Sequence, residues 1–92
     1  DLAEAHVCAV RMCLERAGIE TLNIGTGTGY SVLDVIGAYE AACGHPIARV
    51  TAPRRPGDVA SYFADPTRAL ARMRWRARRS LADMCRDAAR FE

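Results

Sequence analysis

The residues of this sequence that first suggest chemistry are the glycines of the stretch GTGTGYS, residues 25–31. A glycine-rich turn between a strand and a helix can hold the phosphates of a dinucleotide. Its fingerprint is G-x-G-x-x-G, with an acidic residue at the end of the next strand. Gly25 and Gly27 fit, but Tyr30 occupies the third glycine position, and the next β-prone run ends ARVTA without an acid. The residues favour a tight turn whose glycines permit positive φ and close backbone approach, with contact to some ligand as the alternative.

Basic residues are the second group of candidate binding residues, and all 13 of them are arginine. The chain therefore lacks the lysine of a G-x-x-x-x-G-K-[ST] phosphate loop. Residues 1–48 contain two arginines and six acids, whereas residues 49–92 contain eleven arginines and five acids, so we expect an anion to bind in the second half. The run RALARMRWRARR, residues 68–79, could bind nucleic acid through its arginines and Trp75. The alternative is a solvated turn between two helices.

Thiols and imidazoles offer a weaker case for a metal or redox site. The four cysteines are Cys8, Cys13, Cys43 and Cys85. None of them forms a C-x-x-C pair, and His6 and His45 have no ligand-like spacing to them, so we expect free, buried thiols rather than disulfides or a zinc site. The chain has no apolar run of about 20 residues and begins without a signal-like segment, and we therefore expect a cytoplasmic location.

Four helices are expected around these groups. Apolar residues recur at helical spacing over about 2–17 and over 32–43. Ser31 and Asp34 form a capping-box pair before the second of these helices, and Ser80 and Asp83 form another before the last helix. A short helix is expected from Asp65 as N-cap, with Pro66 as its first residue, to about residue 73. The stripe of residues expected to be buried on the second helix is Val32, Val35, Ile36, Tyr39 and Cys43.

Two short β-prone runs, residues 20–25 and 46–52, complete the pattern. A strand, a helix and a strand with connections of this length predict a right-handed βαβ unit. We therefore predict an α/β fold, with a small αβαβ core and two further C-terminal helices. Residues 1–92 are expected to form a single domain, because no linker, repeat or low-complexity tract interrupts them.

Two specific motifs occur in the chain: N-x-G-T-G-x-G-x-S-V-L, from Asn23 to Leu33, and P-R-R-x-G-D, from Pro53 to Asp58. With these motifs, the order of the segments resembles the C-terminal part of the UDP-glucose 4-epimerase (UDP-galactose 4-epimerase) family. DLAEAH at the start and RWRARRSLADMCRDAARF at the end extend the resemblance over essentially all 92 residues. The family consists of isomerases of galactose metabolism and belongs to the extended short-chain dehydrogenases/reductases.

The resemblance implies a fold without its NAD-binding half. Family members have a large N-terminal Rossmann domain that binds NAD and a smaller C-terminal domain that clasps the UDP-sugar. Their hydride chemistry uses a Tyr-x-x-x-Lys pair, in which the lysine lowers the pKa of the tyrosine so that it acts as a base. This chain contains no lysine, so we expect neither catalytic residues nor a cofactor in it.

What the resemblance does carry over is a nucleotide-sugar site. Arg55 matches the arginine that pairs with the UDP diphosphate, and Asp58 matches the acid that binds the uridine ribose hydroxyls. Val32 matches a position near the nucleotide, and Tyr62 matches a position that borders the sugar. The alternative for Arg55 and Asp58 is a local salt bridge of the loop, which contributes little when exposed.

These features predict a UDP-glucose 4-epimerase fragment, or a stand-alone relative of the substrate domain, that is inactive alone and binds UDP-glucose or UDP-galactose weakly at most. Further UDP-contacting residues of the family would precede Asp1. The partner expected for the uncovered surface is a separate Rossmann half or a second copy of the chain. The alternatives are a self-associating interaction module and, less favoured, an arginine-rich nucleic-acid-binding domain.

Overall fold

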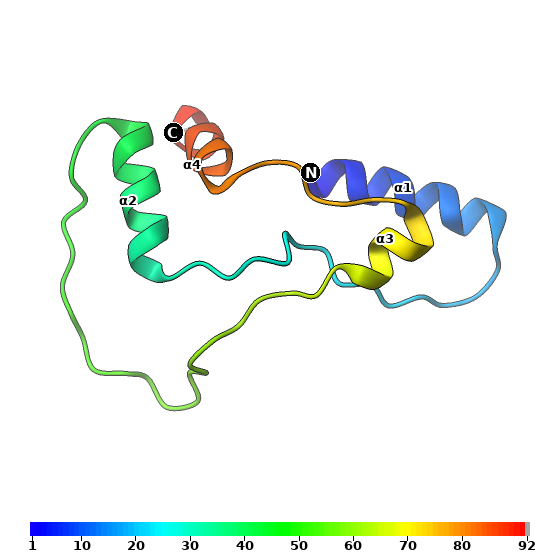
Figure 1. The fold of residues 1–92 in the computed structure, drawn as a ribbon, viewed down its shortest axis with the longest axis horizontal. Helices are drawn as coiled ribbons and strands as arrows, with labels where there is room; N and C mark the ends of the chain where they lie inside the picture. Colours follow the sequence, from blue (N-terminus) through cyan, green and yellow to red (C-terminus); the bar gives the residue numbers. More distant parts are fainter. Residues whose placement is uncertain (92) are drawn as a thin grey trace. The chain divides into compact units, whose positions relative to one another are not determined.

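The computed structural model describes residues 1–91, in which four helices are present (Figure 1). They are α1 (Leu2–Glu15), α2 (Val32–Cys43), α3 (Thr67–Met73) and α4 (Leu81–Phe91). The chain divides into two compact units. Unit 1 comprises Asp1–Thr28 and Phe63–Arg78, and unit 2 comprises Gly29–Tyr62 and the chain from Arg79 onward. Within residues 1–91, no helix combines the length and the apolar character that crossing a membrane would need.

The two predicted strands are not confirmed, so neither the α/β class nor the αβαβ core is observed. Residues 1–91 contain no strand. No backbone–backbone hydrogen bond involves residues 20–25 or 46–52 in that part of the chain. A strand exists only where a neighbouring segment accepts and donates along its length, and β-prone residues specify an extended backbone without specifying that neighbour.

Unit 1 is held by a small core in which α1 meets α3. Ala5 of α1 is 2 % exposed, Ala69 of α3 is 0 % exposed, and Trp75, which follows α3, is 5 % exposed. Partly buried side chains surround this group, namely Cys8, Ile24, Met73 and Ala77. Alanines at the contact allow the two helices to approach closely, and the indole fills the space beside them. The indole Nε1 of Trp75 is buried without a hydrogen-bond partner, which costs about 1–3 kcal/mol.

The glycine stretch makes the tight turn that the residues favoured. Gly27 has a φ of 76°, a conformation that glycine adopts without strain. Gly25 lies so close to a neighbouring segment of unit 1 that a Cβ atom on it would be 2.9 Å from the Cβ of Ala64. Both glycines are therefore required by the backbone, one for its dihedral angle and one for close approach.

Unit 2 packs α2 against α4, and its core is smaller still. Cys85 of α4 is 5 % exposed, and its Sγ lies 4.0 Å from the backbone oxygen of Val35 in α2. The expectation of a buried stripe on α2 was wrong, because none of its residues is buried. Val32, for example, is 75 % exposed. Within residues 1–91 the only helix that contacts α2 is α4, and one short helix does not cover an apolar stripe.

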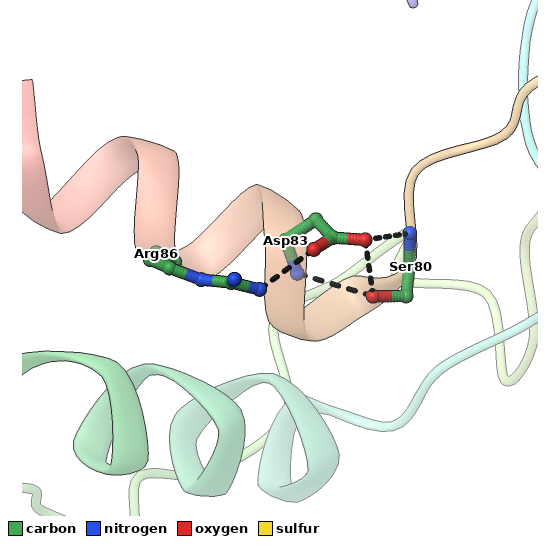
Figure 2. A network of polar contacts seen from close by, with 3 residues as sticks. All are labelled: Ser80, Asp83 and Arg86. Carbon is green, nitrogen blue, oxygen red and sulfur yellow. Dashed lines mark hydrogen bonds and ion pairs between the residues drawn. The ribbon is translucent and has the colours of Figure 1, made fainter.

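Both predicted capping boxes are confirmed. At α2, the Oγ of Ser31 accepts a hydrogen bond from the backbone N–H of Asp34 at 3.1 Å, and the Asp34 carboxylate accepts one from the backbone N–H of Ser31 at 2.8 Å. At α4, Ser80 and Asp83 repeat this pattern at 3.2 Å and 2.9 Å (Figure 2). Arg86 adds a contact of 2.6 Å to the second Asp83 oxygen.

The other helix ends differ slightly from the expectations. Helix α1 ends at Glu15 rather than near residue 17. Helix α3 begins at Thr67, one residue later than expected, so Pro66 precedes its first residue. The N-cap is Pro66 and not Asp65 as expected, but the Asp65 Oδ1 accepts a hydrogen bond of 2.9 Å from the backbone N–H of Thr67. The C-cap of α3 is Arg74, the only non-glycine residue with positive φ, 54°, in the described chain.

We predict that replacing Gly25 with alanine destabilises the chain, whereas replacing Gly37 with alanine does not. The added methyl at Gly25 would collide with the Cβ of Ala64, which is fixed to the backbone, at a cost of about 1–3 kcal/mol. Gly37 lies within α2 with nothing near its added Cβ, so alanine is expected to stabilise by up to about 1 kcal/mol. Urea unfolding followed by circular dichroism measures both. Equal stabilities of Gly25→Ala and the wild type would refute the close approach.

We also predict a loss of helix in acid. Hydrogen bonds from Ser31 lower the pKa of Asp34, those from Ser80 lower the pKa of Asp83, and Thr67 does the same for Asp65. A lowered folded-state pKa means that the stabilisation is complete above the unfolded pKa and is lost as pH falls below about 4. A pH titration of the helical circular dichroism signal is expected to show this loss. An Asp34→Asn, Asp83→Asn variant should start lower and change less, and an unchanged titration would contradict the capping role.

Candidate functional site

The loop after α2 brings together two of the predicted site residues. Arg55 and Asp58 form an ion pair, with 3.5 Å between Nε and Oδ2. The backbone N–H of Asp58 donates to the carbonyl of Arg55 at 3.3 Å, and Gly57 between them has a φ of 87°. A second arginine, Arg54, donates to the carbonyl oxygen of Asp58 at 2.8 Å. The loop therefore presents two guanidinium groups and one carboxylate from five consecutive residues.

This loop is open to solvent. The side chain of Arg55 is 87 % exposed and that of Asp58 is 44 % exposed. An exposed pair of this kind contributes at most about 1 kcal/mol to stability. The guanidinium group can therefore leave the carboxylate at little cost and contact a phosphate, for which its planar donor fork is suited.

The remaining two predicted site residues lie in the same unit without a polar link to this pair. Val32 is the first residue of α2 and is 75 % exposed. Tyr62 is 91 % exposed, and its hydroxyl makes no hydrogen bond within residues 1–91. Each side chain is thus available to a ligand, but the structure gathers only Arg55 and Asp58 at a common point.

A feature that the sequence did not suggest is an ion-pair clamp in unit 1. Glu20 accepts hydrogen bonds from two arginines of α3: Arg68, at 2.7 Å, and Arg72. Hydrogen bonding from Arg72 is the main reason that the pKa of Glu20 is lowered, and the charges of both arginines add to it. No local signal predicts this clamp, because its partners lie 48 and 52 residues from Glu20.

Glu20 and Arg72 of the clamp line a hollow of about 310 Å³ in unit 1. Residues from α1 form one side, and residues 17–24 form another. Its lining is mainly apolar and includes Ala9, Met12, Leu22 and Ile24. None of the residues predicted for UDP-sugar binding lines it. No group of three histidine, cysteine, aspartate or glutamate side chains suited to a metal ion occurs in residues 1–91.

Comparison of the sequence with known proteins gives a consistent result. No family model matches the chain. The UDP-glucose 4-epimerase of Bacillus subtilis is 46 % identical to it over 92 residues, which are 100 % of this chain and 27 % of that enzyme. The UDP-glucose 4-epimerase of Bos taurus is 44 % identical over 100 % of this chain and 26 % of its own length. The chain thus spans about a quarter of the length of these curated relatives.

Comparison with solved structures gives the same family. The UDP-glucose 4-epimerase of Bifidobacterium longum in complex with NAD+ and UDP matches with a TM-score of 0.85 and 43 % identity, over 96 % of this chain and 26 % of that one. The enzyme of Stenotrophomonas maltophila, with bound NAD and formylated UDP-arabinopyranose, matches with a TM-score of 0.90 and 43 % identity. The match covers 98 % of this chain and 27 % of that one. In sequence and in structure, this chain matches the C-terminal region of the UDP-glucose 4-epimerases.

Proposed function

We propose that this chain is the UDP-sugar-contacting part of an epimerase-like protein, either as a fragment or as a stand-alone relative. The observation that carries the proposal is the similarity over the whole chain to an epimerase whose structure holds NAD+ and UDP. The chain covers only 26 % of that enzyme, so UDP-glucose/UDP-galactose interconversion is proposed for the complete protein. The chain alone is proposed to bind the UDP-sugar weakly.

The proposed contacts begin at the loop of Arg55 and Asp58. Arg55 exchanges its exposed carboxylate partner for the diphosphate, and Asp58 accepts hydrogen bonds from the ribose hydroxyls. Val32 packs near the nucleotide and Tyr62 borders the sugar. Because these side chains are largely exposed and only two of them are linked, binding must order the others, and that cost keeps the affinity low.

We further propose that a Rossmann half supplies the neighbouring segments that the two β-prone runs need to form strands. Residues 20–25 and 46–52 have the composition of strands and no backbone partner within residues 1–91. Several large apolar side chains are also exposed, among them Leu14, Ile19 and Val50 at 83 %, 98 % and 93 %. A Rossmann half, on the same or a separate polypeptide, would cover such side chains and complete an α/β fold. A homodimer is the alternative way to cover them.

We predict that UDP-glucose binds with a dissociation constant of about 1 mM or weaker, and that Arg55→Ala weakens this binding at least about tenfold. The reason is the loss of the charge-assisted contact to the diphosphate. NMR titration of the 92-residue chain measures both values. Arg49→Ala is the matched control, since Arg49 is an exposed arginine of the same unit that makes no ion pair in the described chain, and it should leave binding unchanged. If the wild type does not bind UDP-glucose at millimolar concentration, the similarity to the epimerases reflects common ancestry and not retained binding.

We predict that the chain alone does not interconvert UDP-galactose and UDP-glucose, even with NAD present. It contains no lysine, so no Tyr-x-x-x-Lys pair can hold a proton-accepting tyrosine. The measurement is product formation from UDP-galactose with excess NAD, with a full-length epimerase as positive control. NAD-dependent turnover by this chain would show that another residue acts as the base.

A further inference from the structure

Two adjoining hollows of unit 1 carry a concentration of arginine that the UDP-sugar proposal does not use. The first, of about 450 Å³, lies between α1 and residues 74–78. The second, of about 300 Å³, lies between α1 and the end of α3. Cys8, Arg11 and Arg74 line both hollows, so the two form a continuous surface. We call it the arginine hollow.

The charge of the arginine hollow is strongly positive. Its six arginines are Arg11, Arg16, Arg72, Arg74, Arg76 and Arg78. The acids that face it are Glu4 and Glu15 of its lining, and Asp1, whose carboxylate accepts a hydrogen bond of 3.0 Å from the backbone N–H of Arg78. Only Arg72 among the six arginines makes an ion pair within residues 1–91, and its partner is Glu20. Five guanidinium groups are therefore left to a ligand.

Arg74 and Trp75 of the segment that follows α3 line the arginine hollow. The buried indole of Trp75 lines the arginine hollow, and its N–H is a donor without an acceptor. This N–H is itself buried, so the preference for an anion comes from the guanidinium groups that line the hollow. Arg74 holds its side chain at the hollow from a left-handed backbone conformation that glycine adopts more readily, with a φ of 54°. This conformation ends α3, and from there Arg74 lines both parts of the hollow.

We propose that the arginine hollow binds a ligand that carries several phosphate groups. Guanidinium groups match phosphate oxygens with paired N–H donors, and the hollow offers them from two different segments, α1 and residues 74–78. Stacking of a nucleobase on Trp75 is excluded as its basis, because that ring is 5 % exposed. The recognition is therefore of phosphate, and it belongs to unit 1, whereas the residues proposed for UDP-sugar belong to unit 2.

The test uses Trp75, the only tryptophan of the chain, as an internal probe. Inorganic tripolyphosphate is titrated into the 92-residue chain at low salt while the tryptophan emission is recorded. A saturable change is expected, with a dissociation constant that rises as potassium chloride is added. No saturable change at millimolar tripolyphosphate would overturn the proposal.

Arg74→Gly is the decisive variant because it removes a guanidinium group and relaxes the backbone at the same position. We expect its thermal midpoint to be no lower than that of the wild type and its dissociation constant for tripolyphosphate to be about tenfold higher. Arg11→Gln should weaken binding similarly, whereas Arg49→Gln, with the same change of charge in unit 2, should not. Equal binding by Arg74→Gly and wild type, or equal weakening by the control, would overturn the proposal.

Two additional experiments identify the kind of phosphate ligand and distinguish the arginine hollow from the proposed UDP-sugar site. If a single-stranded oligothymidylate displaces tripolyphosphate, the site binds the phosphates of a polymer backbone. If it does not, the site binds a small polyphosphate. Both results retain the phosphate chemistry. Arg55→Ala is expected to leave tripolyphosphate binding unchanged, and Arg74→Gly is expected to leave UDP-glucose binding unchanged. Loss of both ligands in both variants would contradict two separate sites.

Discussion

The contact of Ala5 and Ala69 with the ring of Trp75 is the constraint on which unit 1 depends. It fixes α1 against α3 through residues that leave no room for a longer side chain, since Ala69 is fully buried. The Glu20 clamp joins the segment after α1 to α3, and side chains of both helices and of residues 74–78 line the arginine hollow. The positions of the arginines that line the arginine hollow therefore depend on an apolar contact of three residues.

Much of the helical structure could be predicted from the sequence because its determinants are local. Ser31 with Asp34 and Ser80 with Asp83 lie three residues apart, and each pair closes a helix end by itself. The bounds of α2 follow from the first pair and from Gly44, which has a φ of 80° at the C-cap. These signals need no knowledge of the rest of the fold.

The features that the sequence could not predict depend on distant partners. The β-prone runs form no strand in the described chain, because composition does not specify the neighbouring segment that a strand requires. The incomplete burial of the α2 stripe has the same origin, since helical spacing identifies an apolar face without identifying the element that covers it. In the candidate site, the ion pair of Arg55 and Asp58 could be predicted because the two residues are close in the sequence. The contacts of Glu20 with two arginines could not be predicted, because these partners are distant in the sequence.

The discontinuity of unit 1 has a consequence for the order of folding. Its first part, Asp1–Thr28, contains Ala5 and Glu20, while their partners lie in Phe63–Arg78. During synthesis from the N-terminus, α1 must wait until residue 78 has been added before its core and clamp can close. Closing a loop of 48 residues costs more entropy than forming a cap three residues long. The caps, whose partners are three residues apart, are therefore expected to form before either unit closes.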